Sequence, residues 1–533
     1  MKRKAVILAS LLAATALLSA EPARLTENQK ITHVLNRLGF GARPGDVERL
    51  KKMGVDAYIE QQLHPERIDD SALAAKLKDF PSLTMSTREI NEKFLNPNDL
   101  ARTLGLIRPN GGTPQSDPEM RRKVMAEFQE RGLYQPQRLL QDLQGQKLVR
   151  AVSSERQLEE VMADFWFNHF NVYWAKGQDR QFTTEYEMKA IRPHVLGKFK
   201  ELVTATAKSP AMLFYLDNFQ SSVPDPRIEL RRQRMLNAPA QRRKAGINEN
   251  YARELMELHT LGVDGGYTQK DVQEVARAFT GWTIDRPRAD AEFMFRDQMH
   301  DKGSKVVLGH TINTGGMRDG EQVIDILVHH PSTARFIATK LVRRFVSDEP
   351  PKSLVDKVAA TYTKTDGDIR EMLRTIFKSD EFFAPEAYRA KTKSPFELAA
   401  SSLRALGTET NGAPRLSQMV ERMGQPMYRY QAPTGFPDRA SQWVSSGTLV
   451  ERLNFGVALS ANKVPGSSVD LSQFSEGSNT PENVIDRAVR VLLNGDVSEQ
   501  TMKILAEQLR TTTEPPLVKA FALVLGSPEF QKR

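Results

Sequence analysis

The amino-acid sequence predicts a mainly α-helical, multi-helix globular protein with one small β-hairpin near residues 292–309. Three observations predict this fold class. Apolar residues recur at helical spacing along most of the 533 residues, and glycines or prolines end the runs. The composition, 40% hydrophobic and 26% charged, is that of an ordinary globular protein. Near 292–309 the apolar pattern changes to the alternation of β-strands.

Residues 1–20 have the three parts of a signal peptide. A basic start at 1–4 is followed by an apolar run, and the small residues Ser19 and Ala20 supply a cleavage point. No later segment approaches 18 consecutive apolar residues, so we expect no transmembrane segment after the signal is removed. The sequence therefore predicts an exported protein, either periplasmic or secreted.

Three regions follow the signal peptide. Residues 21–145 form an N-terminal helical region with a variable loop at 81–118, which is rich in Pro, Gly, Asn and Ser. Residues 146–310 form a central helical signature region that contains the hairpin. Residues 311–533 form a C-terminal helical region.

The elements of the central region are marked by their end residues. A helix over 248–261 should stop at Gly262, and Thr268 with Asp271 makes a capping box for the next helix. Phe293 and Phe295 then alternate with less apolar residues, and a turn at 301–303 precedes a short apolar run. This alternation predicts the hairpin.

Composition also excludes several classes of function. The chain has no cysteine, which excludes disulfides, zinc–thiolate sites and a thiol nucleophile. The net charge of +9 and the basic stretch 220–246 could indicate a polyanion-binding patch. No aromatic residues interleave there for base stacking, so we favour an exposed loop and expect no nucleic-acid partner.

The helix at 248–262 carries the most unusual set of polar residues. At 100° per residue, Tyr251, Leu255 and Leu258 share a buried face. Polar residues lie along its margin, where partly buried carboxylates can act as general acids or bases. The alternative is a solvated face with an i,i+4 ion pair between Arg253 and Glu257. The polar set is Asn250, Arg253, Glu254 and Glu257.

Three further residues are candidates for chemistry. His169 lies within an apolar helical stripe, where it is either catalytic or a core histidine bonded to a carbonyl or carboxylate. His300 and Asp301 fall at the hairpin turn, as catalytic residues or as turn formers. His259 follows Glu257 at a spacing that does not suit one metal ion on a helix, so we predict no metal site. The sequence leaves cofactors open.

The chain resembles the bacterial family called domain of unknown function 1800. The resemblance runs over nearly the whole mature length and is carried by a series of segments: HVLNRLGFGARPGDVERL at 33–50, FWFNHFNV at 165–172, NENYARELMELHTLGVDGGYTQKDV at 248–272, FTGW at 279–282 and PTGFPDRASQW at 433–443. It implies an exported, mainly helical protein, without implying an activity. It also implies a possible partner, a co-exported protein of phosphatase fold.

Two functional hypotheses remain open. The first is an extracytoplasmic, hydrolase-like enzyme in which Glu254 is the acid–base group, with His169 or His300 second, and Arg253 anchors an anionic group. The second is a non-catalytic binding or assembly protein that acts with the co-exported partner. Convergence of Glu254, His169 and His300 on one concave site would favour the enzyme.

Overall fold

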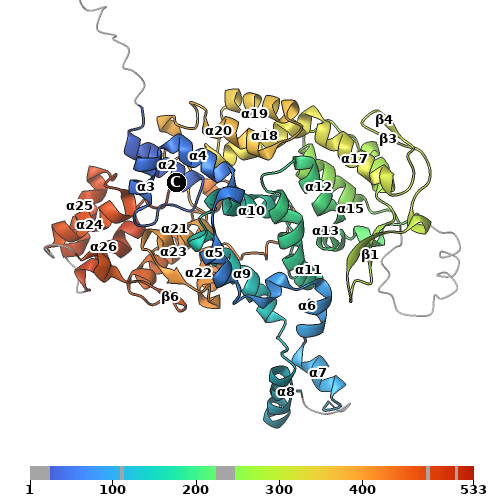
Figure 1. The fold of residues 1–533 in the computed structure, drawn as a ribbon, viewed down its shortest axis with the longest axis horizontal. Helices are drawn as coiled ribbons and strands as arrows, with labels where there is room; N and C mark the ends of the chain where they lie inside the picture. The colour runs from blue at the N-terminus through green and yellow to red at the C-terminus, as the bar shows by residue number, and fades with distance from the viewer. Residues whose placement is uncertain (1–23, 108–112, 224–245, 476–479, 511–513) are drawn as a thin grey trace, which may run out of the picture.

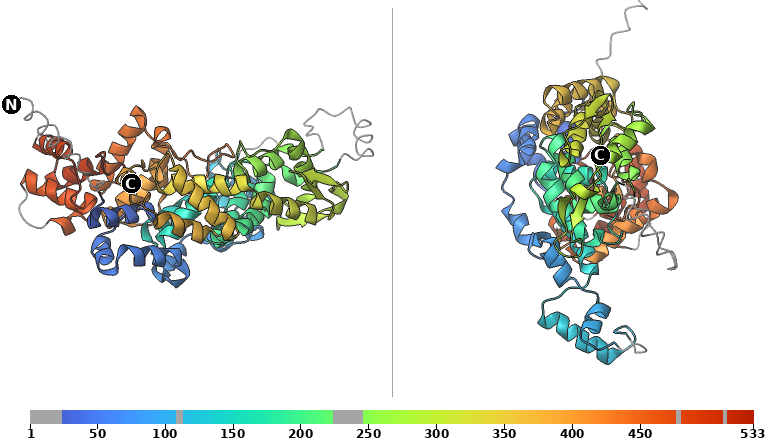
Figure 2. Two further views of the ribbon diagram at one scale, coloured as in Figure 1. Left: turned by 90° about the horizontal axis from the view of Figure 1, so that it is seen from above. Right: turned by 90° about the vertical axis from the view of Figure 1, so that its right-hand side faces the viewer.

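The computed structural model describes residues 24–107, 113–223, 246–475, 480–510 and 514–533. The predicted signal peptide at 1–20 and most of the basic stretch 220–246 lie outside the described residues. The fold is mainly helical, as predicted. The body is elongated, with the C-terminal helices at one end and short β-hairpins at the other (Figures 1 and 2).

The N-terminal region is built from short helices whose ends follow local sequence. A capping box at Thr26 begins the first of them, and Gly54 separates the second from the third. The helices are α2 (Glu27–Arg37), α3 (Asp46–Met53), α4 (Val55–Leu63), α5 (Ser71–Leu77), α6 (Thr87–Lys93), α7 (Pro97–Thr103) and α8 (Pro118–Glu130). Helices α7 and α8 project from the body and bury a small apolar cluster of their own, which includes Leu100, Val124 and Phe128 (Figure 1).

The central region begins within α9, and α9 and α10 both lie in the middle of the body (Figure 1). Its helices are α9 (Gln137–Ser153), α10 (Gln157–His169), α11 (Asp179–Glu185), the π-helix η3 (Tyr186–Ile191), α12 (Phe199–Lys208), α13 (Pro210–Tyr215), α15 (Glu249–Glu254), the π-helix η6 (Leu255–Thr260) and α16 (Gln269–Ala278). The predicted capping box of Thr268 and Asp271 begins α16, and Gly262, at φ 83°, follows η6.

The strands near 292–309 pair differently from the single hairpin that we expected. Strand β2 (Glu292–Phe295) pairs back with β1 (Trp282–Asp285), and β3 (Lys305–Val307) pairs forward with β4 (His310–Ile312). Leu308 and Gly309 both have positive φ, the geometry of a tight two-residue hairpin turn. The 301–303 segment therefore connects two hairpins. A third pair, β5 (Glu409–Thr410) with β6 (Ser467–Ser468), lies in the C-terminal region.

The C-terminal region completes the body. Helix α18 packs on α17, α19 and α20, while α26 packs on α23, α24 and α25. Its helices are α17 (Met317–His329), α18 (Pro331–Phe345), α19 (Lys352–Lys364), α20 (Ile369–Phe377), α21 (Pro395–Ala405), α22 (Pro414–Arg422), α23 (Ser446–Ser460), α24 (Pro481–Leu493), α25 (Glu499–Arg510) and α26 (Pro516–Leu525).

One continuous apolar core runs through the body, from Ile31 to Phe530, and all three predicted regions contribute to it. Burial of this apolar surface is the main force that holds the helices together. The region boundaries at 145 and 310 stay a prediction. Among the described residues, no helix combines the length and apolar character needed to cross a bilayer.

The π-helix η6 changes the faces of the helix at 248–262. Tyr251 and Leu255 are buried as predicted, but Leu258 is only partly buried, and Met256 and His259 take its place in the core. A π-helical turn holds more residues than an α-turn, so every side chain after Leu255 is rotated away from its 100° position. The prediction for Leu258 was wrong for this reason.

Candidate functional site

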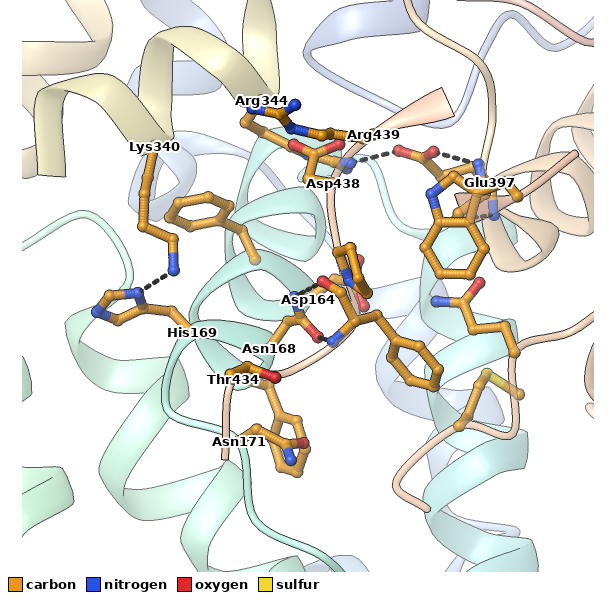
Figure 3. A pocket seen from close by; sticks show the side chains of 18 of the residues that line it. Asp164, Asn168, His169, Asn171, Lys340, Arg344, Glu397, Thr434, Asp438 and Arg439 are labelled. Atoms are coloured by element: carbon orange, nitrogen blue, oxygen red, sulfur yellow. Dashed lines mark hydrogen bonds and ion pairs between the residues drawn. The ribbon is translucent and has the colours of Figure 1, made fainter. Parts of the chain in front are cut away.

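A cavity of about 280 Å³ opens where α9, α10, α18 and α21 meet the loop 425–443 (Figure 3). A second cavity, of about 590 Å³, lies between α6, α11, α12 and β2. Charged residues on the walls of the second cavity bind oppositely charged neighbours, as in the pairs Arg88–Asp290, Lys189–Glu185 and Lys208–Glu321. The first cavity also contains ion pairs, such as Lys147–Asp164. Its Lys340 and Arg343, by contrast, form no ion pair with a carboxylate of the described residues, and we take this cavity as the candidate site.

Two asparagines at the end of α10 hold the loop that covers the cavity. Asn168 donates to the backbone oxygen of Phe436 at 2.9 Å and accepts from its backbone nitrogen at 2.7 Å. Asn171 donates to two other loop carbonyls. Gly435, at φ 68°, passes so close to Asn168 that a Cβ would lie 2.1 Å from the Asn168 carbonyl oxygen. The segments 165–172 and 433–443 therefore form one structural unit.

His169 and Lys340 form a hydrogen-bonded pair on the cavity wall (Figure 3). The Lys340 Nζ donates to His169 Nδ1 at 2.7 Å, and His169 Nε2 donates to the backbone oxygen of His259 at 3.1 Å. These two bonds require the neutral imidazole with its proton on Nε2. Burial, then the charge of Lys340, lowers the pKa of His169 well below its usual value.

Lys340 titrates close to neutral pH. Burial, reinforced by repulsion from Arg343 and opposed by Asp438, lowers its pKa to about 8. The amine is partly buried, and no carboxylate forms an ion pair with it within the described ranges. A lysine in this state exchanges a proton at physiological pH, as a general acid or base must.

Another part of the cavity wall, which begins one turn further along α18, is charged and firmly held. Arg344 Nη1 lies 2.6 Å from Glu397 Oε1, and Lys391 Nζ lies 2.9 Å from Asp438 Oδ1. Burial opposes the ionisation of Glu397, but Arg344 and Arg533 bring its pKa to about 2. These carboxylates are therefore ionised at neutral pH and fix the orientation of the cations beside them.

The residues predicted on the helix at 248–262 lie elsewhere. Glu254 is partly buried, and its pKa is raised by burial and by Glu257. Asn250 is exposed. Arg253 donates to Gln269 at 2.7 Å and approaches Glu249 at 3.9 Å, so the predicted pair with Glu257 does not form. Instead, Glu257 accepts from the Tyr267 hydroxyl at 2.9 Å, because the π-turn moves Glu257 away from Arg253.

His300 and Asp301 belong to a third location. His300 is buried, with its Nδ1 2.8 Å from the Thr280 carbonyl oxygen and its Nε2 3.2 Å from Asp319. Asp301 receives two hydrogen bonds from Arg277, at 2.8 and 3.0 Å, and one from the Gly303 backbone. Of the four residues predicted to be catalytic, the cavity contains His169, and Glu254, His300 and Asp301 do not line it.

A comparison with protein families gives one match. The model of a family described as a protein of unknown function (DUF1800) matches residues 33–532. The chain belongs to this family. No curated protein and no solved structure matches the chain.

In this DUF1800 protein, the match includes every segment that lines the cavity. Sequence reasoning missed the charged cavity residues Lys340, Arg343, Arg344, Glu397 and Asp438, among others. Two features could have indicated three of these. Lys340 and Arg344 lie at the margin of an apolar helical face, and Glu397 is the last residue of a Ser-x-x-Glu capping box. Elsewhere too, the described part of this DUF1800 chain brings together no group of three His, Asp or Glu side chains that could hold a metal ion.

Proposed function

We propose that this DUF1800 protein is an enzyme that performs acid–base chemistry in the cavity beside α10 and α18. The observation that carries the proposal is the 2.7 Å hydrogen bond between Lys340 and His169 at the cavity wall, together with the pKa of about 8 for Lys340. Perturbed titratable pairs in a concave site are typical of catalytic centres. The proposal keeps His169 in the site, changes its role from acid–base group to the residue that positions the amine, and adds Lys340 as the acid–base group.

Hydrolysis is the reaction that this pair suits best. At pH 7 a lysine with a pKa near 8 is neutral in roughly a tenth of the molecules, and the neutral amine can take a proton from an attacking water. The ammonium that results can donate the proton to the leaving group. Neutral His169, fixed by the His259 carbonyl, accepts from Lys340 and holds its amine in place.

The test measures the titration of Lys340 directly. Limiting acetylation of the full chain across pH 6–11, read by peptide mass spectrometry, should give a midpoint near pH 8 for Lys340, well below the value of about 10.4 that is usual for a lysine. A midpoint near that usual value contradicts the proposal. In parallel, hydrolysis of p-nitrophenyl esters and phosphates should be lost in Lys340→Met and kept in Lys352→Met.

A specific observation supports the second candidate, a binding or assembly protein. Helix α23 exposes a row of aliphatic side chains directly after the cavity loop: Leu449, Val450, Leu453 and Val457, each 39–55% exposed. Exposed apolar patches are typical of protein contacts. The partner implied by the family resemblance is the co-exported phosphatase-fold protein. Light scattering of the two proteins mixed, with Val450→Glu as the variant, tests this candidate.

Export is part of the proposal. The basic, apolar and small-residue segments of 1–20 support a signal peptide that is cleaved near Ala20 and a periplasmic or secreted location. Intact-mass measurement of protein from the cell envelope or medium should show a loss of about twenty residues. Full-length protein in the cytoplasm would contradict export.

A further inference from the structure

Three cations on one face of α18 line the cavity: Lys340, Arg343 and Arg344. Their i, i+3, i+4 spacing places Arg343 and Arg344 one turn after Lys340 on the side of α18 that lines the cavity. Lys340 and Arg343 have no carboxylate ion pair among the residues that the structure describes. Arg344 uses Nη1 on Glu397, while its Nε and Nη2, although buried, have no hydrogen-bond partner there. Buried donors without partners are rare in folded proteins.

The region behind this wall contains more positive than negative charge. Six cations there, named here the basic cluster, are at least nine-tenths buried: Arg37, Arg344, Lys391, Lys393, Arg452 and Arg533. The carboxylates that form ion pairs with them are Glu397, Asp438 and Asp348. A fourth carboxylate, Asp164, pairs with Lys147 and also attracts Arg344 and Arg533. Six basic side chains therefore face four acidic ones in a place that water reaches poorly.

The excess of positive charge acts on Lys393, whereas Arg452 reflects burial, and Glu397, Asp438 and Asp164 raise the pKa of Arg344 against its burial. Burial, with repulsion from neighbouring arginines, lowers the pKa of Lys393 to about 7. Burial lowers the pKa of Arg452 to about 10. Uncompensated buried charge is costly, and an anion in the adjoining cavity would lower that cost. The wall of α18 is the part of this positive region that the cavity reaches.

Aromatic side chains form another part of the wall, beside polar and acidic residues that include Asp164, Asn168 and Glu397. Phe165, Phe436 and Trp443 line the cavity, and the rings of Phe436 and Trp443 lie 5.7 Å apart. Aromatic walls suit a flat or apolar group. At about 280 Å³, the cavity fits a small molecule.

We infer that the cavity binds the oxyanion of a small substrate, a carboxylate or a phosphate, at Lys340, Arg343 and Arg344, with the apolar part of the substrate against the aromatic walls. This inference rests on the proposed function, because it names the substrate class of the same cavity. Guanidinium groups bind carboxylate and phosphate through paired hydrogen bonds. Arg343 and Arg344 would hold the anion, and Lys340, one turn earlier, would face the atom that reacts.

The experiment is a calorimetric titration of the full chain in Tris chloride at pH 7. The probes are benzoate, its uncharged analogue benzamide, and inorganic phosphate. Benzoate or phosphate should bind, and benzamide should bind at least about tenfold more weakly than benzoate, since it lacks the charge. Binding of benzoate alone assigns a carboxylate, and binding of phosphate alone assigns a phosphate.

Variants on α18 test whether its cations bind the anion. Arg343→Gln should weaken anion binding about tenfold. Arg335→Gln makes the same charge change on the outer side of α18, where Arg335 is 58% exposed, and should leave binding unchanged. Arg344→Gln breaks the pair with Glu397 and is informative only if its circular dichroism and melting show a folded chain, whereas Arg343 is partly exposed and outside that pair.

Failure of the inference and failure of the proposed function can be told apart. If no anion binds the wild type, or if benzamide binds as well as benzoate, the oxyanion site is overturned even when Lys340 titrates near pH 8. If an anion binds through Arg343 but Lys340 titrates like an exposed lysine, the oxyanion site stands and the acid–base pair falls.

Discussion

Two regions of the molecule each bury a histidine beside a lysine. Among the described residues, the lysine forms an ion pair with a carboxylate in only one of the two regions. In the region of β3 and α17, Lys305 Nζ lies 2.6 Å from Asp319 Oδ2, and His300 lies 3.2 Å from the same atom. In the cavity, Lys340 donates to neutral His169 and has no carboxylate ion pair in the described part of the chain.

The difference separates buried charge that holds the fold from buried charge that is available to a ligand. The side chains of Lys305 and His300 are 0% exposed and that of Asp319 is 2% exposed, so this cluster is closed and its charges are matched. Its role in the hairpin is to anchor β3 to α17. The pair of Lys340 and His169 borders open space, and its charge is unmatched. The presence of a buried histidine does not distinguish the two; the partner of the lysine does.

The closed cluster should give the largest change in stability. Lys305→Met leaves Asp319 buried without its cation, and we expect the free energy of unfolding to fall by about 3–5 kcal/mol in urea denaturation. Lys302→Met is the control, because its pair with Asp297 is exposed and is expected to contribute below about 1 kcal/mol. A loss at Lys305 no greater than that at Lys302 would remove the distinction between the two regions.

This loss should depend on pH. Burial opposes ionisation of Asp319, but hydrogen bonds from Lys305, Thr314 and the Gly315 backbone keep its pKa below the usual 3.8. A carboxyl with a lowered pKa stabilises the fold above its unfolded pKa and loses that contribution as pH falls through the folded pKa. The difference between wild type and Lys305→Met should therefore shrink in strong acid.

Replacing the lysine of the Lys340–His169 pair should change the free energy of unfolding in the opposite direction. Lys340→Met removes an ammonium whose burial is unfavourable, so the free energy of unfolding at pH 7 should rise by about 1–2 kcal/mol while hydrolysis is lost. The folded pKa, about 8, lies below the unfolded value of 10.5, so the cost in the wild type is complete below pH 8. The gain should therefore disappear between pH 8 and pH 10.5. Destabilisation by this variant would place Lys340 with Lys305 as a structural residue.

The contrast between the regions also shows what the sequence can predict. Helical spacing placed Tyr251, Leu255 and His169 in the core correctly, because each depends on one helix alone. It misplaced Leu258, because a π-turn leaves no mark in the apolar period. The hairpin pairing differed because the glycine turn at Leu308 and Gly309 gives β3 a closer partner than β2.

The cavity could not be derived in the same way. It combines the end of α10, the last turns of α18, the start of α21 and the loop at 425–443, which are far apart in sequence. Periodicity indicates which face of a helix is buried, but not which other segment that face meets. The Asn168 clamp on Phe436 is the contact that brings two of these segments together, and neither residue alone predicts it.

The smallest expected effect concerns Glu254, the acid–base residue predicted from sequence. Its carboxylate makes no hydrogen bond or ion pair within the described residues, so Glu254→Gln removes no charge-assisted bond of the kind that would cost 1.5–3 kcal/mol. Burial and the neighbouring Glu257 raise its pKa. The ionised carboxylate of Glu254 is therefore disfavoured in the folded state. The resulting loss of stability is complete above the pKa of the folded state and absent below the pKa of the unfolded state.

We expect Glu254→Gln to raise the free energy of unfolding at pH 7 by no more than about 0.5 kcal/mol, and to lose this gain towards pH 4. Glu257→Gln is the matched control, because the amide oxygen of the new side chain can still accept the hydrogen bond from the Tyr267 hydroxyl. Hydrolysis of the p-nitrophenyl substrates should be unchanged in both variants if the chemistry lies at Lys340. If Glu254→Gln instead abolishes hydrolysis with stability intact, the catalytic role predicted for Glu254 is supported. In that case the reaction takes place at Glu254, and the cavity beside α18 is at most a binding site.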